Sequence, residues 1–224
     1  MKMYILSLCL ILFCVLMISN GKIANASNTP FWDNILAKYQ TNQRVKQLIF
    51  VKYQGGTDAQ LELYEKDMDN QWEKVLSCAG YVGKNGLGKT VEGDMKTPRG
   101  DYGIFTAAGI EPNPGTKADY LLLDEHIFCA DGAYYNKLID DRELSKEVLD
   151  KLDLDPMNNG APQFNYGLFI DYNRECKEGL GSYIFLHCFG EDQYTHGCVA
   201  VSEENMIKIL QHVDNNVRIC IYPK

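Results

Sequence analysis

The sequence has few cationic residues for its length. Its 224 residues include 22 lysines and arginines against 30 aspartates and glutamates, which gives a formal net charge of −8 at pH 7. Proteins that bind nucleic acid or anionic lipid through their overall charge carry an excess of cations, because phosphate groups attract them. The charge balance therefore argues against nucleic acid, or an anionic lipid surface, as a partner.

The sequence also lacks a Cys-x-x-Cys pair, the usual spacing of a structural zinc site. Histidines and cysteines do occur close together, in His187-Cys188 and in His196-Gly197-Cys198. Zinc ligands usually come as well-separated pairs on turns, and along an extended strand neighbouring side chains point to opposite faces. We therefore expect this cluster to work without a metal, and the protein to need no cofactor.

The N-terminal apolar run is too short for a comfortable membrane span, which needs about 20 apolar residues. It covers residues 4–18, follows Lys2 and precedes the small-residue pattern Ala24-Asn25-Ala26. This arrangement is typical of a secretory signal peptide. We expect residues 1–26 to be cleaved after Ala26, with an uncleaved anchor as the alternative. The protein would then be exported to the cell wall, the extracellular space or a periplasm, and would meet a membrane only through this segment.

Six cysteines remain after residue 26. An exported chain with an even number of cysteines can carry disulfides, but a domain of this size does not need them. The sequence assigns no pairing to these residues, which are Cys78, Cys129, Cys176, Cys188, Cys198 and Cys220.

The residues that carry chemistry gather between positions 187 and 202. The preceding segment, Ser-Tyr-Ile-Phe-Leu at residues 182–186, is typical of a short buried strand that ends at His187. A thiol is a good nucleophile as the thiolate, and a neighbouring imidazole can accept its proton. The pattern predicts Cys198 as a nucleophile and His187 as its general base. The alternative for Cys198 is a buried structural thiol.

Two neighbours complete this hypothesis. A base must be held in one orientation, and we expect a backbone carbonyl near Cys188 to fix the imidazole of His187. Gly197 has no side chain, so it would let a substrate carbonyl approach the sulfur of Cys198. It would also leave backbone N–H groups to act as an oxyanion hole.

Thr195-His196-Gly197-Cys198-Val199, after a strand that ends in His187, resembles the signature of the L,D-transpeptidase (YkuD-type) family. Lys96-Thr97-Pro98-x-Gly100 is similar to the TPxG segment of that family, which forms a turn into a core strand. The resemblance extends over roughly residues 46–222. It implies that Cys198 is the acylated nucleophile and His187 the base. It also implies that Thr195, His196 and Gly197 line the site, and we expect Cys188, next to His187, to line it as well.

This sequence departs from the family pattern at two points. The gap between His187 and Cys198 is shorter than in many members, and Ala200 stands where many have arginine. Tyr134-Tyr135-Asn136 resembles a segment that lies near the substrate cleft in one branch of the family. The resemblance therefore implies that Tyr135 and Asn136 bind substrate, whereas plain chemistry allows turn packing as well.

The hydrophobic pattern predicts a mainly β fold with a few helices, which agrees with the β-sandwich-like catalytic fold that the resemblance implies. Residues 48–53, 61–65 and 72–79 are typical of adjacent antiparallel strands. A helix or linker is expected over residues 27–45 and the catalytic domain over residues 46–224. The charged segment at residues 140–155 is expected to be partly helical, and Ser202 is expected to cap a further helix after the motif. Residues 83–90 contain the letters of a phosphate-binding loop, but the Gly, Asp and Pro that follow them break the helix that such a loop requires.

The resemblance implies an exported cysteine transpeptidase that acts on peptidoglycan stem peptides, for 3-3 cross-linking or D-amino-acid exchange. It also implies acylation by carbapenem-type β-lactams. Two alternatives remain open. The first is an L,D-carboxypeptidase that uses water at the same site. The second is a cell-wall-binding domain with an idle site.

Overall fold

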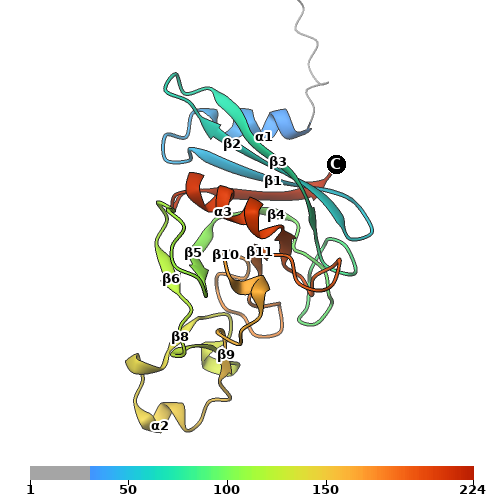
Figure 1. Cartoon of the computed structure of the whole chain (residues 1–224). Coiled ribbons are helices and arrows are strands. Elements are labelled where there is room, and N and C mark those ends of the chain that lie inside the picture. The colour runs from blue at the N-terminus through green and yellow to red at the C-terminus, as the bar shows by residue number, and fades with distance from the viewer. Residues whose placement is uncertain (1–30) are drawn as a thin grey trace, which may run out of the picture.

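The computed structural model of the protein describes residues 31–224 (Figure 1). The predicted signal peptide, residues 1–26, lies outside the described residues. Among the residues that are described, no helix combines the length and the apolar character that a membrane crossing requires.

The prediction of a mainly β fold with a few helices is confirmed. The α-helices within residues 31–224 are α1 (Phe31–Gln40), α2 (Lys146–Leu149) and α3 (Glu203–His212). Ten strands form a mixed sheet in the order β4-β13-β1-β2-β3-β12-β11-β10-β5-β6. Their bounds are β1 (Gln47–Gly55), β2 (Asp58–Lys66), β3 (Trp72–Tyr81), β4 (Gly100–Tyr102), β5 (Ile104–Gly109), β6 (Tyr120–Leu122), β10 (Gly167–Ile170), β11 (Phe185–Cys188), β12 (Val199–Val201) and β13 (Arg218–Pro223).

The three-strand meander predicted for the N-terminal half is confirmed, because β1 pairs antiparallel with β2 and β2 with β3. All four residues of the apolar run 48–51 are completely buried in β1. Alternate residues of a strand face opposite sides of the sheet. Leu48 and Phe50 pack with α1, whereas Ile49 and Val51 pack with α3. The run is continuous because a helix covers each face.

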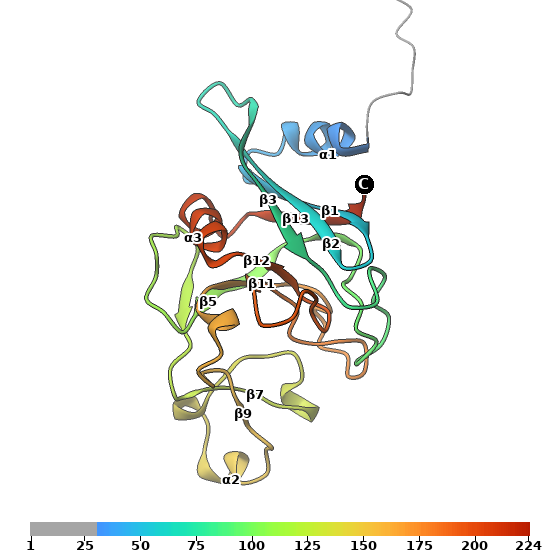
Figure 2. The ribbon, with the colours of Figure 1, turned by 45° about the vertical axis from the view of Figure 1, so that its right-hand side comes forward.

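The two helices lie on either side of the meander (Figure 2). α1 buries Trp32, Ile35 and Tyr39 against one face. On the other face, α3 starts at Ser202, whose hydroxyl accepts a hydrogen bond from the N–H of Asn205. This is the predicted helix start, and two glutamates in the first turn suit the positive end of the helix dipole. α3 therefore fixes the chain directly after the Cys198 segment.

A small lobe extends from the sheet at the end distant from α1 (Figures 1 and 2). It contains a second sheet of three short strands, β7 (Ile127–Cys129), β8 (Ile139–Asp140) and β9 (Asp155–Pro156), together with α2. The charged segment at residues 140–155, predicted as partly helical, provides only one α-helical turn here. Three short 3-10 helices, at Gly132–Tyr134, Asp141–Glu143 and Pro162–Phe164, complete the described elements.

All six cysteines of the described chain are unpaired thiols. Several lie in apolar surroundings, where the charged thiolate is poorly solvated. Burial raises the pKa of Cys78 to about 11 and the pKa values of Cys129 and Cys188 to about 12. These thiols therefore stay protonated at neutral pH and behave as small apolar side chains.

We expect the free energy of unfolding to fall as the pH rises from about 9 to about 12. A thiol whose pKa is raised in the folded state stabilises the fold fully below its unfolded pKa of about 9.0, and this contribution is lost as the pH rises through the folded value. Urea unfolding at a series of pH values measures the slope. Cys188→Ala should flatten the slope, and Cys176→Ala, at a half-buried position, serves as the matched control. Equal slopes for both variants would contradict the prediction.

Candidate active site

Cys198 and His187 line the same cavity, which has a volume of about 620 Å³. Cys198 is half-buried and directly precedes β12, while His187 lies within β11. β11 and β12 are parallel neighbours, and the register places His187 beside Ala200. The rest of the lining comes from residues 159–164, Ala200 and most of residues 190–196.

The imidazole of His187 is fixed by the backbone of its own strand. Its Nδ1 lies 2.6 Å from the carbonyl oxygen of Cys188, so Nδ1 carries the hydrogen and Nε2 carries the lone pair. This is the backbone carbonyl expected from the sequence, and that prediction is confirmed. The ring of Phe164 packs against the imidazole with its centroid 5.7 Å away. His187 therefore has the tautomer that a general base requires.

The sulfur of Cys198 contacts two backbone groups of the segment that leads into β11. Sγ accepts a hydrogen bond from the N–H of Phe185 at 3.3 Å and donates to the carbonyl of Tyr183 at 3.4 Å. The N–H of Phe185 is a contact that favours the thiolate. The carbonyl of Tyr183 holds the thiol hydrogen in the resting state, so this hydrogen must leave that carbonyl before His187 can accept it.

The Cys198 thiol and the His187 imidazole are both uncharged at neutral pH. The surrounding protein raises the pKa of the Cys198 thiol to about 11, since burial disfavours the thiolate. Burial also lowers the pKa of His187 below its usual range, because it disfavours the imidazolium. A neutral imidazole beside a neutral thiol suits general-base activation during attack, rather than a preformed ion pair.

Two threonine hydroxyls hold the carbonyl of Cys198. Thr195 Oγ1 donates to this oxygen at 2.6 Å and Thr97 Oγ1 at 2.9 Å. Each hydroxyl also accepts a backbone N–H, from Gly197 at 3.1 Å and from Gly83 at 2.8 Å respectively. The nucleophile is thereby tied both to its own turn and to the TPxG segment about a hundred residues earlier in the chain.

The glycine-rich loop acts as a clamp on the Thr195 turn. The N–H of Thr195 donates to the carbonyl of Val82 at 3.0 Å, and the N–H of Lys84 donates to the carbonyl of Thr195 at 2.9 Å. A side chain at Gly83 would collide with the backbone carbonyl of Met95. The loop therefore needs glycine for close packing of backbones, and no helix follows it.

Gly197 plays a different role from the one expected. Its φ of +148° favours glycine, and a Cβ there would face inward, 3.1 Å from the carbonyl of Lys96 and 3.2 Å from Ile184. Its N–H is used by Thr195. The N–H of Cys198, in contrast, has no acceptor among the described residues. The oxyanion donor that the geometry offers is therefore the amide of Cys198 itself.

Of His196 and Cys188, which were both expected to line the site, only His196 lines the cavity. His196 is exposed, stacks on the ring of Tyr194 and lines the cavity, as expected for a residue at its mouth. Cys188 does not line the cavity, which corrects the expectation. Its thiol is 1% exposed, lies in the main core and points to the carbonyl of Tyr166 at 3.5 Å. The alternation of the strand turns it away from His187.

Tyr135 and Asn136 also lie outside the cavity lining, so the expectation that they bind substrate is corrected. The Tyr135 hydroxyl accepts the N–H of Gly181 at 2.9 Å and donates to Glu92 at 2.6 Å. Asn136 accepts the N–H of Tyr183 through its side-chain oxygen at 2.8 Å. Both side chains are almost fully buried. They hold the segment whose Tyr183 carbonyl contacts the Cys198 thiol.

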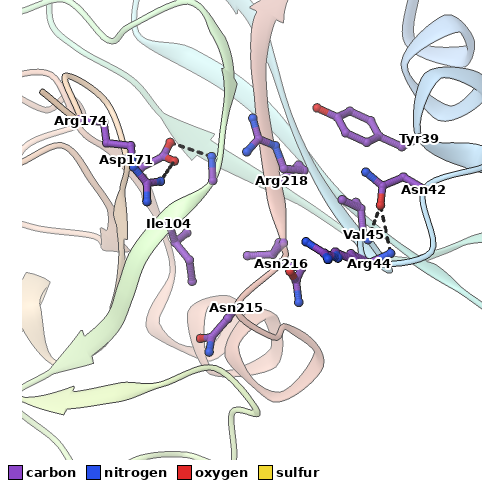
Figure 3. A pocket seen from close by; sticks show the side chains of 12 residues that line it. Tyr39, Asn42, Arg44, Val45, Ile104, Asp171, Arg174, Asn215, Asn216 and Arg218 are labelled. Carbon is purple, nitrogen blue, oxygen red and sulfur yellow. Dashed lines mark hydrogen bonds and ion pairs between the residues drawn. The ribbon is translucent and has the colours of Figure 1, made fainter.

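A second cavity, of about 290 Å³, lies between the α1–β1 connection and strands β5 and β13 (Figure 3). It shares no lining residue with the first cavity. Arg174 pairs there with Asp171 at 3.0 Å, and Arg218 donates to the carbonyl of Asp101 at 3.0 Å. Cys198 and His187 thus line the first cavity and not the second.

A comparison with family models matches residues 49–221 to the L,D-transpeptidase catalytic domain, YkuD. The chain belongs to this family. The match confirms the resemblance read from the two motifs and covers β1 to β13. No curated protein sequence matches the chain closely enough to add to this assignment.

The L,D-transpeptidase domain uses three residues whose proximity to the site the sequence did not reveal. Thr97 was expected only to form a turn, yet it donates to the carbonyl of Cys198. Lys89 and Asp94 form an ion pair of 3.1 Å, and the lysine side chain is 1% exposed. In the sequence, this buried pair is visible only as a lysine and an aspartate within a loop rich in glycine.

We expect Thr97→Val to lower the free energy of unfolding by about 1–3 kcal/mol, because it leaves the buried N–H of Gly83 without its acceptor and removes one of the two hydroxyls that donate to the carbonyl of Cys198. Urea unfolding at pH 7 measures the change. Thr97→Ser keeps the hydroxyl and is the matched control. Similar losses for valine and serine would mean that the methyl group, not the hydroxyl, matters at this position.

Proposed function

We propose that the protein is an exported cysteine L,D-transpeptidase that acts on peptidoglycan stem peptides through a thioester. The observation that carries the proposal is the geometry of one cavity, which is lined both by Cys198 and by a His187 whose Nδ1 is fixed by a backbone carbonyl. The family match over residues 49–221 supports the reaction class. The signal-peptide pattern of residues 1–26 supports export to the cell wall, the extracellular space or a periplasm.

The acylation half-reaction follows from these groups. Nε2 of His187 accepts the thiol hydrogen as Sγ of Cys198 attacks the carbonyl carbon of an L-to-D peptide bond. The carbonyl oxygen becomes an oxyanion, which the N–H of Cys198 can stabilise. The intermediate collapses when the C–N bond breaks. The leaving D-amino acid takes the hydrogen from His187, and a thioester remains on Cys198.

The second half-reaction runs in the opposite sense. An acceptor amine attacks the thioester carbon, gives its hydrogen to His187, and a new C–N bond forms as the C–S bond breaks. The hydrogen returns from His187 to the sulfur of Cys198. Because the imidazole must be neutral to accept each hydrogen, a lowered pKa of His187 keeps the base competent at neutral pH and into mildly acidic conditions.

The charge of the cavity favours an amine over other acceptors. Its lining contains Glu191 and Asp192 and no lysine or arginine. Both carboxylates are exposed on the loop between β11 and Cys198. Such a wall attracts a cationic amine and repels a free carboxylate. Ala200, where many relatives have arginine, leaves this negative potential uncompensated. An amine-bearing acceptor strand therefore fits better than water as the principal acceptor.

We expect a carbapenem to form one covalent adduct per chain, detected by intact mass. Cys198→Ala should give no adduct, since the nucleophile is absent. His187→Ala should slow adduct formation by about 100-fold or more, because a general base contributes about that much. Cys188→Ala is the matched control. It also removes one cysteine, but from outside the cavity lining, and should react like the wild type.

The same samples test the reaction on a tetrapeptide stem. Release of its terminal D-amino acid together with cross-linked or exchanged product supports the transpeptidase. Release with water as the only productive acceptor would identify an L,D-carboxypeptidase. Absence of both adduct and release, from a folded protein, would favour a wall-binding domain with an idle site.

The double variant Glu191→Gln/Asp192→Asn should shift the reaction from aminolysis toward hydrolysis by about threefold to tenfold, because two exposed charges near the cavity attract the amine weakly. The measurement is the ratio of exchanged to hydrolysed product at low ionic strength. Raising the salt concentration should reduce the difference between variant and wild type.

Glu73→Gln/Asp69→Asn removes the same charge at exposed positions around the start of β3 and serves as the control. If this control shifts the ratio as much as the cavity variant, the effect comes from net charge alone. An unchanged ratio in the cavity variant would remove the argument for an amine-attracting wall.

A further inference from the structure

A buried lysine lies beside the turn that carries the nucleophile. The side chain of Lys89 is 1% exposed, and its Nζ donates to Asp94 at 3.1 Å. Asp94 is the acceptor found for this ammonium among the described residues. An ammonium has three N–H donors and is costly to bury without compensating partners. The fold therefore retains a positive charge in its interior at a considerable cost in desolvation.

Two glycines leave room for the side chain of Lys89. A Cβ on Gly181 would collide with Cε of Lys89, and a Cβ on Gly197 would lie 3.5 Å from its Nζ. Both glycines have positive φ values, +108° and +148°. The ammonium thus lies directly against the His196-Gly197-Cys198 turn at Gly197.

The carboxylate of Asp94 is shared among several donors. Its oxygens accept backbone N–H groups from Thr90 at 2.9 Å, Val91 at 3.3 Å and Lys96 at 2.9 Å, besides the ammonium of Lys89. These contacts hold the pKa of Asp94 at about 2. Because four donors compensate this one negative charge, it neutralises the neighbouring ammonium only in part.

Besides Lys89, the charged group that acts on the Cys198 thiol is Glu92, and His187 lines the same cavity. Glu92 is negative and cannot stabilise a thiolate. Its carboxylate accepts hydrogen bonds from Tyr135 at 2.6 Å and from Ser182 at 2.7 Å. Burial has the largest effect on the Cys198 thiol and raises its pKa, whereas the N–H of Phe185 and the field of Lys89 lower it. The field of Glu92 acts in the same direction as burial and raises it.

We propose that Lys89 is a positioning cation for the nucleophile, whose buried ammonium stabilises the thiolate of Cys198 as His187 removes the hydrogen. The inference rests on the proposed role of Cys198 as the nucleophile. This role explains why an ammonium is buried at a position where an apolar side chain of similar length would pack without the desolvation cost. It also explains why the Lys89 side chain ends at the turn and not in the solvent.

The test is the pH dependence of Cys198 alkylation by iodoacetamide, quantified at this cysteine by peptide mass in the full-length protein. Lys89→Met should raise the apparent pKa of the thiol by about one unit, which is a tenfold slower reaction at any pH well below the pKa. Lys84→Met is the matched control. It removes the same charge from the same loop, but Lys84 is exposed and packs over the ring of Tyr194.

A second variant separates electrostatics from structural damage. Asp94→Asn removes the compensating carboxylate and should shift the apparent pKa of the thiol downward, opposite to Lys89→Met. Lys89→Gln gives a polar replacement if the methionine variant does not fold, as judged by circular dichroism. An unchanged pKa in the folded Lys89 variants, or a shift in the same direction for Asp94→Asn, overturns the proposal.

The alkylation assay needs no peptidoglycan substrate, so its outcome is independent of the carbapenem and tetrapeptide experiments. A protein that forms no acyl adduct but still shows opposite pKa shifts in the two variants would refute the proposed function and keep the electrostatic role of Lys89. A protein that is acylated normally, with no pKa shift in either variant, would support the proposed function and refute the electrostatic role of Lys89.

Discussion

The hydrogen bonds to the carbonyl oxygen of Cys198 are the constraint on which the site depends. Thr97 and Thr195 donate to this one oxygen from segments that are far apart in the sequence. Each hydroxyl also receives a backbone N–H, so the two loops are joined through fully used donors and acceptors. The sulfur then meets the amide of Phe185, and the adjacent strand presents His187. Catalytic geometry of this kind is positioned by backbone contacts and not by flexible side chains.

The polar groups behind the turn form a second layer of support. Tyr135 and Asn136 hold the segment at residues 181–183, which carries the carbonyl that receives the thiol hydrogen. Lys89 and Asp94 fill the space on the inner side of the glycine turn. Buried polar networks are favourable only when their members find partners. Here the hydrogen bonds that satisfy the network also hold the segments that contact the Cys198 turn, so folding and preorganisation of the site are coupled.

Local patterns predicted much of this structure, because they depend on near neighbours. The meander, the start of α3 and the backbone carbonyl that orients His187 follow from strand alternation, helix capping and the geometry of one strand. The reason that position 197 needs glycine could not be predicted in this way. A Cβ there would face the carbonyl of Lys96, which belongs to a loop distant in the sequence. Tyr135 was misassigned for the same reason, since its partners become neighbours only through tertiary folding. Long-range contacts leave no periodicity in the sequence.

The position of β13 has a consequence for how the chain is made. The last strand pairs in parallel with β1, the first strand, and separates it from β4. A ribosome therefore emits every residue from β1 to β13 before the edge of β1 finds its final neighbour. Structures dominated by such non-local pairings also fold slowly. The nascent chain would keep the edge of β1 accessible to chaperones until β13 emerges, so the order of synthesis itself delays the assembly of the sheet that holds Cys198 and His187.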